Sequence, residues 1–155
     1  MCGRNQEGQL GLGNLTDEFT PYFVNRIPEK INNLACGDLH TLVLTVSGQM
    51  YAMGDNKLCQ LGTGEPNEKP SALPLLLEDI SSRRVTKIRA GKFSAAMSPD
   101  GEVYVWGTGE FGQFASPCLM KTQLDVVDIQ VSRLGLACLV GRQGDCYTWG
   151  ANEQG

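Results

Sequence analysis

A short strand that ends in a glycine-rich turn recurs four times in this chain of 155 residues, and it restricts the fold more than any other feature. The copies lie at Gly3–Gly13, Tyr51–Gly64, Tyr104–Phe114 and Tyr147–Gly155. Aromatic and β-branched residues such as Trp106 and its neighbours favour extended strands. The glycines that follow allow the backbone to bend. Recurrence on this scale indicates a fold built from repeated β units.

Two further landmarks keep the same order within each copy. The segment Ala35–Leu44 aligns with Ala90–Met97 and, less closely, with Val131–Val140. After each of these segments stands a dipeptide that favours a tight turn between strands. These dipeptides are Ser47-Gly48, Asp100-Gly101 and Gln143-Gly144. Each unit therefore predicts a strand, a tight turn, a second strand, a glycine loop and a polar stretch of variable length.

This repeat favours an all-β fold, a β-propeller whose blades are antiparallel sheets of about four strands. We expect one partial propeller domain over 1–155, a partial ring of about three blades. The units are approximately 1–50, 51–103 and 104–146, and another starts at 147–155. Prolines exclude long helices from the variable stretches, so we expect at most one helical turn, near Leu75–Asp79. The variable stretches are Asn14–Lys30, Glu65–Arg84 and Ala115–Leu124.

Composition argues against several classes of protein. The net charge of −4 disfavours binding of nucleic acid or an anionic membrane, because both require a cationic face. The 6 cysteines include no Cys-x-x-Cys pair and there is 1 histidine, so no zinc site is expected. No signal peptide is visible, and no apolar run reaches the roughly 18 residues of a membrane helix. We therefore expect a cytoplasmic or nuclear protein with reduced thiols. One local basic cluster is interpreted as a solvated strand edge or loop: Arg83, Arg84, Lys87, Arg89 and Lys92.

The repeat resembles that of the regulator of chromosome condensation family, which implies a seven-bladed β-propeller. That repeat has an aromatic-Trp-Gly strand end, then an Asn and a Gly-Gln-Leu-Gly-x-Gly turn, and an upstream Ala-Cys-Gly-x-x-His-Thr segment. Gly8–Gly13 and Ala35–Thr41 match closely, Gln60–Gly64 matches well, and Gly112–Phe114 matches in part. The resemblance implies structural roles for thirteen repeat positions: Gly3, Gly8, Gly11, Gly37, His40, Gly54, Gly62, Gly91, Trp106, Gly107, Gly112, Trp149 and Gly150.

Several positions depart from the family pattern. Met53 replaces the aromatic residue before a repeat glycine, and Cys59 occupies a turn-glycine position. Phe114-Ala115 replaces Leu-Gly, which puts the glycine-dependent turn near Ala115 in doubt, and Ser132–Gly135 lacks the glycine and the histidine of its landmark. Because family propellers close with about seven blades, we expect either a longer ring or another chain to supply the remaining blades, and we favour the longer ring.

Three local patterns suggest chemistry that the repeat explains better. Gly107–Gly112 matches the dinucleotide fingerprint G-x-G-x-x-G, with Asp128 downstream, but Pro117 follows where the fingerprint requires a helix. We therefore expect no cofactor. His40 is interpreted as a structural residue of its landmark rather than a catalytic one. Trp106 and Trp149 fill equivalent repeat positions, so they predict core packing rather than the tryptophan cluster of the family's plant ultraviolet photoreceptor branch.

The remaining hypothesis is a surface that binds another protein. Asp38, Asp55, Glu110 and Asp145 lie near the repeat turns and predict an acidic face that docks a basic partner. The function that follows is a non-catalytic protein–protein interaction scaffold. The alternative, which the family resemblance implies, is guanine nucleotide exchange on a small GTPase. In that alternative the variable stretch Glu65–Arg84 is the expected wedge into the GTPase.

Overall fold

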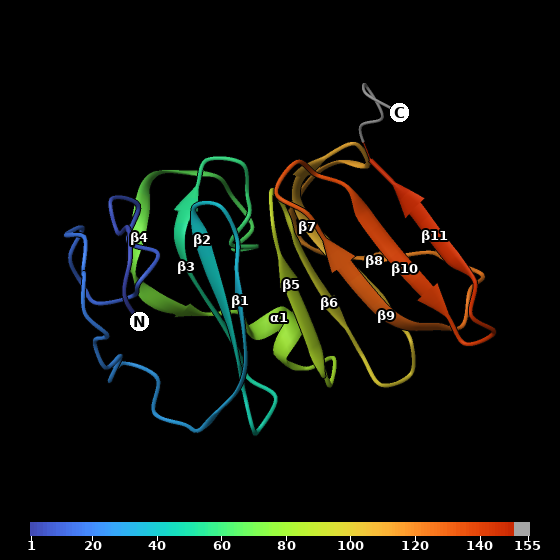
Figure 1. The fold of residues 1–155 in the computed structure, drawn as a ribbon, viewed down its shortest axis with the longest axis horizontal. Coiled ribbons are helices and arrows are strands. Elements are labelled where there is room, and N and C mark those ends of the chain that lie inside the picture. Colours follow the sequence, from blue (N-terminus) through green and yellow to red (C-terminus); the bar gives the residue numbers. More distant parts are fainter. Residues whose placement is uncertain (151–155) are drawn as a thin grey trace.

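The computed structural model describes residues 1–150, whose strands form three antiparallel sheets in which each strand pairs with the next along the chain (Figure 1). We call these sheets the first, second and third blades. The first contains β1 (Ile31–Cys36), β2 (His40–Thr45), β3 (Met50–Asn56) and β4 (Asn67–Leu76). The second contains β5 (Lys87–Ala90), β6 (Ser94–Met97), β7 (Val103–Gly109) and β8 (Gly112–Met120). The third contains β9 (Val126–Val131), β10 (Ala137–Gly141) and β11 (Cys146–Trp149).

This architecture confirms the predicted all-β partial propeller. The outermost strand of the first blade, β4, lies within the variable stretch Glu65–Arg84, where the sequence pattern gave no strand. Its two prolines, Pro70 and Pro74, are compatible with a strand because β4 is at the edge of its sheet. A short helix, α1 (Glu78–Ser81), follows β4 and overlaps the helical turn predicted near Leu75–Asp79.

The N-terminal segment precedes the first blade, and two parts of it pair with each other like neighbouring strands. Gly3 forms an antiparallel bridge with Glu18, and the main chains of Met1 and Tyr22 exchange hydrogen bonds. By repeat position these residues correspond to the third and fourth strands of a preceding blade. The sequence units starting at 51, 104 and 147 likewise begin at β3, β7 and β11, so each blade combines the end of one unit with the start of the next.

The hydrophobic core lies between blades rather than within any one of them. Leu42 and Leu44 of β2 point toward the second blade and pack with Ile88 and Trp106. Val43, between them in sequence, points the other way and packs near Met1 and Ile27. Because alternate residues of a strand face opposite sides, β2 and β3 are buried on both faces. A second core cluster joins the second and third blades through Phe93, Val105, Ile129, Ala137 and Leu139.

The alternation of strand directions separates the connections into two faces. The loop face is formed by connections 37–39, 57–66, 91–93, 110–111 and 132–136. The turn face is formed by the tight turns 46–49, 98–102 and 142–145, together with the links between blades. Within the described residues, no helix is long and apolar enough to cross a membrane.

Candidate partner-binding surfaces

The first two glycine loops are held in one shape by an asparagine and a glutamine. Asn56 Oδ1 accepts a hydrogen bond from the Leu61 N–H (2.9 Å), and Asn56 Nδ2 donates to the Glu65 carbonyl (2.7 Å). Gln60 Oε1 accepts from the Leu58 N–H (2.8 Å). Asn5 and Gln9 repeat these hydrogen bonds with Leu10, Asn14 and Glu7 in the preceding loop. The loops are therefore internally fixed and do not depend on a partner for their conformation.

Glycine is needed in these loops for backbone conformation and for close approach. Gly62 has a φ of +78°, and a Cβ there would lie 2.7 Å from the Trp106 ring. Gly11 stands in the same relation to Met53, whose sulfur would lie 2.2 Å from such a Cβ. Cys59 adopts a φ of +61° where its equivalent, Gly8, has +73°. The turn therefore keeps its shape without glycine at Cys59, at a cost of about 1 kcal/mol in backbone strain.

The predicted repeat glycines divide into two groups in the structure. Most have a positive φ, which favours glycine: Gly3, Gly8, Gly11, Gly54, Gly62, Gly107, Gly112 and Gly150. Gly37 and Gly91 instead allow neighbouring blades to touch, since a Cβ at Gly37 would lie 2.8 Å from the Gly91 carbonyl oxygen. The Asp38 N–H donates to that same oxygen (3.3 Å), so the inner loops join blade to blade.

Each fixed loop is hydrogen-bonded to the next blade through its glutamine carbonyl. The Gln60 carbonyl accepts from the Ser94 hydroxyl (2.6 Å) and from Trp106 Nε1 (3.0 Å), both in the second blade. The Gln9 carbonyl accepts from the Thr41 hydroxyl (2.8 Å) in the first blade. Sequence analysis did not single out Asn5, Gln9, Asn56 or Gln60, although the asparagines and glutamines recur at equivalent positions of the first two loops.

His40 of the first blade adds a further hydrogen bond at the boundary with the second blade. Its Nε2 lies 2.8 Å from Ser94 Oγ, and the side chain is almost fully buried. Because the Ser94 proton is donated to Gln60, the Ser94 oxygen accepts, and His40 Nε2 must therefore carry a hydrogen. Burial lowers the pKa of His40 from 6.5 to about 4, so the imidazole is neutral at pH 7. This geometry gives His40 a structural role.

The third glycine-rich stretch folds differently from the first two. Gly109 occupies the asparagine position, and the chain forms a hairpin in which Gly109 pairs with Gly112. A strand, β8, therefore follows Gly107–Gly112, where the dinucleotide fingerprint requires a helix. In the third blade Ala137 replaces the hydroxyl residue. Among residues 1–150 the buried indole nitrogen of Trp149 has no hydrogen-bond partner, whereas that of Trp106 has one.

The structure does not bring the four predicted acidic residues together. Asp38 and Glu110 are exposed on the loop face, but Asp145 is exposed on the turn face. Asp55 is only 4 % exposed, and its carboxylate accepts a hydrogen bond from Gln60 Nε2 (2.9 Å). Asp55 therefore belongs to the internal support of its loop.

The loop face is mixed in charge and contains exposed leucines. Arg133 forms an ion pair with Asp38, Nε to Oδ1 at 3.0 Å, and this pair spans from the third blade to the first. The neighbouring Leu134 is 81 % exposed, and Leu58 is exposed on the second fixed loop. Sequence analysis missed Leu134. The available signal was its departure from the landmark, because the connection 132–136 is longer than its counterparts.

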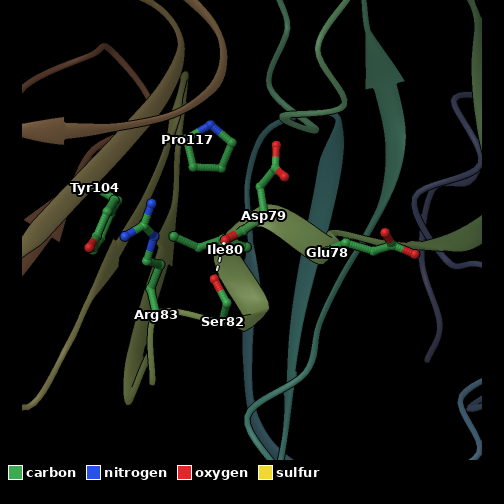
Figure 2. A pocket seen from close by; sticks show the side chains of 7 residues that line it. All are labelled: Glu78, Asp79, Ile80, Ser82, Arg83, Tyr104 and Pro117. Carbon is green, nitrogen blue, oxygen red and sulfur yellow. Dashed lines mark hydrogen bonds between the residues drawn. The ribbon is translucent and has the colours of Figure 1, made fainter.

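A groove lies at the outer end of the boundary between the first and second blades. One cavity of about 340 Å³ is lined by Glu78, Asp79, Arg83, Tyr104 and Pro117, among others (Figure 2). A second cavity, of about 240 Å³, shares Glu78, Asp79 and Pro117 with it and extends toward the fixed loop. The Arg83 guanidinium lies 5.9 Å from the centre of the Tyr104 ring. Charged side chains therefore line much of the groove, and Tyr104 and Pro117 give it an apolar side.

The described residues offer no clear inorganic site. Among residues 1–150, no group of three His, Cys, Asp or Glu side chains is arranged to hold a metal ion. All six cysteines, which lie within this range, are free thiols.

Comparison with known protein families matches the chain to the "Regulator of chromosome condensation (RCC1) repeat" over residues 1–44 and 47–97. The X-linked retinitis pigmentosa GTPase regulator of Canis lupus familiaris is 42 % identical over 115 residues, which are 73 % of this chain and 11 % of that protein. The human E3 ubiquitin-protein ligase HERC2 is 32 % identical over 165 residues, covering 98 % of this chain and 3 % of that ligase.

Solved structures share the fold at lower sequence identity. Prp20p from Saccharomyces cerevisiae aligns with a TM-score of 0.83 at 21 % identity, over 99 % of this chain and 41 % of Prp20p. Human WBSCR16 aligns with a TM-score of 0.81 at 22 % identity, over 94 % of this chain and 40 % of that protein. This chain therefore spans less than half the length of these propellers and about a tenth of the length of the canine regulator. By its repeats and its fold, the chain belongs to the regulator of chromosome condensation (RCC1) repeat family.

Proposed function

We propose that this chain is a non-catalytic protein–protein interaction scaffold whose loop face docks a protein partner. The observation that supports this most directly is the exposure of Leu134 beside Arg133 on the connection 132–136, which is closed by hydrogen bonds between Ser132 and Leu136. A rigid surface loses little conformational entropy on binding. An exposed apolar side chain among charged ones is the usual composition of an anchor with a polar rim.

We propose that Asp38 and Glu110 contribute to this docking surface. Asp38 already pairs with Arg133, so a partner would meet a bridged acid and base there rather than a purely acidic patch. Glu110 lies at the tip of the β7–β8 hairpin and is exposed. Asp145 is on the opposite face and would need a separate contact. The described relatives support a protein as the partner class, since the Prp20p structure was described with its binding to Gsp1p and histones.

A pull-down against a panel of purified candidate proteins tests the docking surface. We expect Leu134→Glu on the loop face to abolish binding of a partner that the unmodified chain retains. Val46→Glu is the matched control, because Val46 is also exposed but lies on the turn face. A partner that survives Leu134→Glu and is lost with Val46→Glu would contradict the proposed surface.

The second candidate function is guanine nucleotide exchange on a small GTPase, favoured by the 42 % identity to a protein named as a GTPase regulator. Exchange factors open a nucleotide site by binding rather than by covalent chemistry, so no catalytic residues are required. Most of the stretch Glu65–Arg84 is built into the blade as β4 and α1, which argues against a free wedge. Mixing the chain with GTPases loaded with fluorescent nucleotide tests this function. Unchanged release from every GTPase would eliminate it.

We further propose that additional blades continue the ring beyond the third blade. The outer side of that blade exposes Leu136, Val140 and Cys146, which is paired with Val140, whereas the corresponding side of the second blade is packed against a neighbour. Apolar strands of this kind are normally covered. A longer version of the protein that includes the neighbouring blades should protect this side from solvent, measured as slower alkylation of the Cys146 thiol; an unchanged alkylation rate would contradict the proposal.

A further inference from the structure

The ends of the outer strands present equivalent apolar side chains at the rim of the molecule. Leu76 ends β4 opposite Tyr51, and Leu119 lies opposite Tyr104, its counterpart in the second blade. Leu76 is 41 % exposed and Leu119 is 44 % exposed. In the N-terminal segment, Phe23 occupies the same position by its relation to the Met1–Tyr22 pairing, and it is 84 % exposed. Exposure at this position is thus a property of the repeat.

A cavity accompanies each of these side chains. The groove at the boundary of the first and second blades contains Leu76 and Pro117. A cavity of about 180 Å³ contains Phe23 together with Gly11, which is the counterpart of Gly62 in the groove. A third, of about 350 Å³, contains Leu119. The apolar side chain differs in size from blade to blade, but in each case it lines a cavity at the rim.

The ionisable residues that line each hollow leave an excess of one negative charge. Glu78 and Asp79 face a single Arg83 in the groove between the first and second blades. Glu18 is the one ionisable acid beside Phe23, and Asp100 and Glu102 face a single Lys121 beside Leu119. The carboxylates of Glu78 and Asp79 take part in none of the ion pairs formed within residues 1–150. In Figure 2 the Asp79 carboxylate rises to the level of Pro117, Arg83 points toward Tyr104, and Glu78 points away from both.

We propose that the groove between the first and second blades binds an extended, basic segment of a partner protein. One apolar side chain of that segment rests on Leu76 and Pro117, and an adjacent lysine or arginine pairs with Asp79. Two carboxylates with a single opposing cation favour a cationic group and disfavour a phosphate. An open groove between a strand end and a proline fits an extended chain better than a folded element. The groove reaches the loop face at Gly62 and Thr63, but Leu134, Asp38 and Glu110 line neither of its two cavities.

Fluorescence polarisation with a defined peptide tests the proposal on the full 155-residue chain. The probe is a fluorescein-labelled, end-capped octapeptide, Ser-Lys-Pro-Leu-Lys-Val-Lys-Ser. Two matched probes replace its lysines by glutamate, or its leucine and valine by serine. We expect saturable binding of the basic probe and about tenfold weaker binding of either matched probe, because both the charge and the apolar anchor contribute.

Variants separate the groove from general attraction to an acidic protein. We expect Asp79→Lys to weaken binding of the basic probe by about tenfold, and Leu76→Ser by about fivefold, because each removes one of the two anchors. Asp79→Asn is the milder second variant and should weaken binding by about threefold, since it removes charge at nearly constant shape. Glu68→Lys is the control: it changes the net charge by the same amount as Asp79→Lys, but Glu68 is exposed near the start of β4 and lines neither cavity of the groove.

The outcomes distinguish this proposal from its alternatives. Equal losses from Glu68→Lys and Asp79→Lys would show that the peptide responds only to net charge, and would overturn the groove. Absence of saturable binding would overturn it as well. Retained peptide binding in Leu134→Glu would show that the groove acts independently of the loop face.

Discussion

At the scale of single residues, one carbonyl oxygen joins the first two blades. The Gln60 oxygen receives hydrogen bonds from Ser94 and Trp106, and His40 reaches it through Ser94. All four side chains are buried or nearly so. Hydrogen bonds between buried polar groups are costly to leave unmade, so this network favours a single docking geometry of the two blades.

The buried His40 predicts a pH dependence of stability. Its pKa is about 4 in the folded chain and 6.5 as the ordinary value, so the folded state resists protonation. Its stabilising contribution is complete above pH 6.5 and is lost as the pH falls from 6.5 to about 4. The loss amounts to roughly 3 kcal/mol. Urea unfolding at pH 7, 5.5 and 4 measures it.

A His40→Gln variant is the control for this titration. Glutamine does not titrate, so the variant should show a nearly flat free energy of unfolding between pH 7 and 5, although its absolute stability is lower. An unchanged slope in the variant would mean that another group causes the pH dependence.

Gly62 predicts a steric effect that can be separated from backbone strain. Gly62→Ala should destabilise the chain by about 2–4 kcal/mol, since the new Cβ would lie 2.7 Å from Trp106 and must displace it. Gly48→Ala is the matched control, because Gly48 also has a positive φ, +91°, but nothing lies within 4 Å of its Cβ position. The control should lose only about 1 kcal/mol. Equal losses in thermal unfolding would contradict a tight contact at Gly62.

At the scale of elements, the third glycine-rich stretch shows how one substitution changes a connection. With Gly109 in place of asparagine, no side chain is available to fold the loop back, and the β7–β8 hairpin forms instead. Phe111 and Phe114 of this hairpin stack with ring centres 5.6 Å apart, and Phe111 packs edge-on against Phe93. Aromatic contacts therefore replace the hydrogen bonds of the first two loops at this boundary.

The two tryptophans should respond differently to loss of their indole nitrogen. Trp106→Phe removes a hydrogen bond to Gln60 and should cost about 2 kcal/mol. Trp149→Phe removes a buried donor that has no partner within residues 1–150, so its cost should be at least about 1 kcal/mol smaller. Chemical denaturation of both variants compares them. A larger loss for Trp149→Phe would indicate that its nitrogen is bonded in solution.

At the scale of the whole molecule, ion pairs and hydrogen bonds of basic side chains link the innermost strands of the second and third blades. Lys87 Nζ lies 3.0 Å from Asp128 Oδ1, and Arg89 Nε lies 3.0 Å from Gln130 Oε1, so β5 is joined to β9. Burial by itself would raise the pKa of Asp128. Hydrogen bonds from Lys87 and the Ile129 N–H, together with the charges of Lys87 and Arg89, outweigh burial, so the pKa of Asp128 is lowered overall. These two basic residues are therefore half-buried partners of Asp128 rather than members of a solvated edge.

The blades should differ in local stability. The first and second blades are joined by buried hydrogen bonds, whereas the third has a single packed side and lacks the hydroxyl and indole bonds at its boundary. Backbone amides of β10 and β11 should therefore exchange with deuterium at least about tenfold faster than those of β2, β3, β6 and β7. Hydrogen-exchange mass spectrometry measures this. Uniform protection across all three blades would show that the boundaries are equivalent.

The repeat, the all-β class and the propeller could be predicted from the sequence, because glycine turns and strand residues act locally and recur in register. Structural roles for Gly107, Trp106 and His40 were predicted from the family resemblance that the repeat carries. The strand β4 was not identified, since prolines and exposed residues conceal an edge strand that is held by pairing with β3.

Which residues meet on the surface could not be predicted from the sequence and follows from the packing of the blades. The tertiary structure buried Asp55, placed Asp145 on the face opposite Asp38, and exposed Leu134 on a lengthened connection. It also formed the groove from residues of α1 and β8 that are distant in sequence. The physical reason is that strand direction and blade packing set the position of a side chain on the surface, whereas its residue type records only its chemistry.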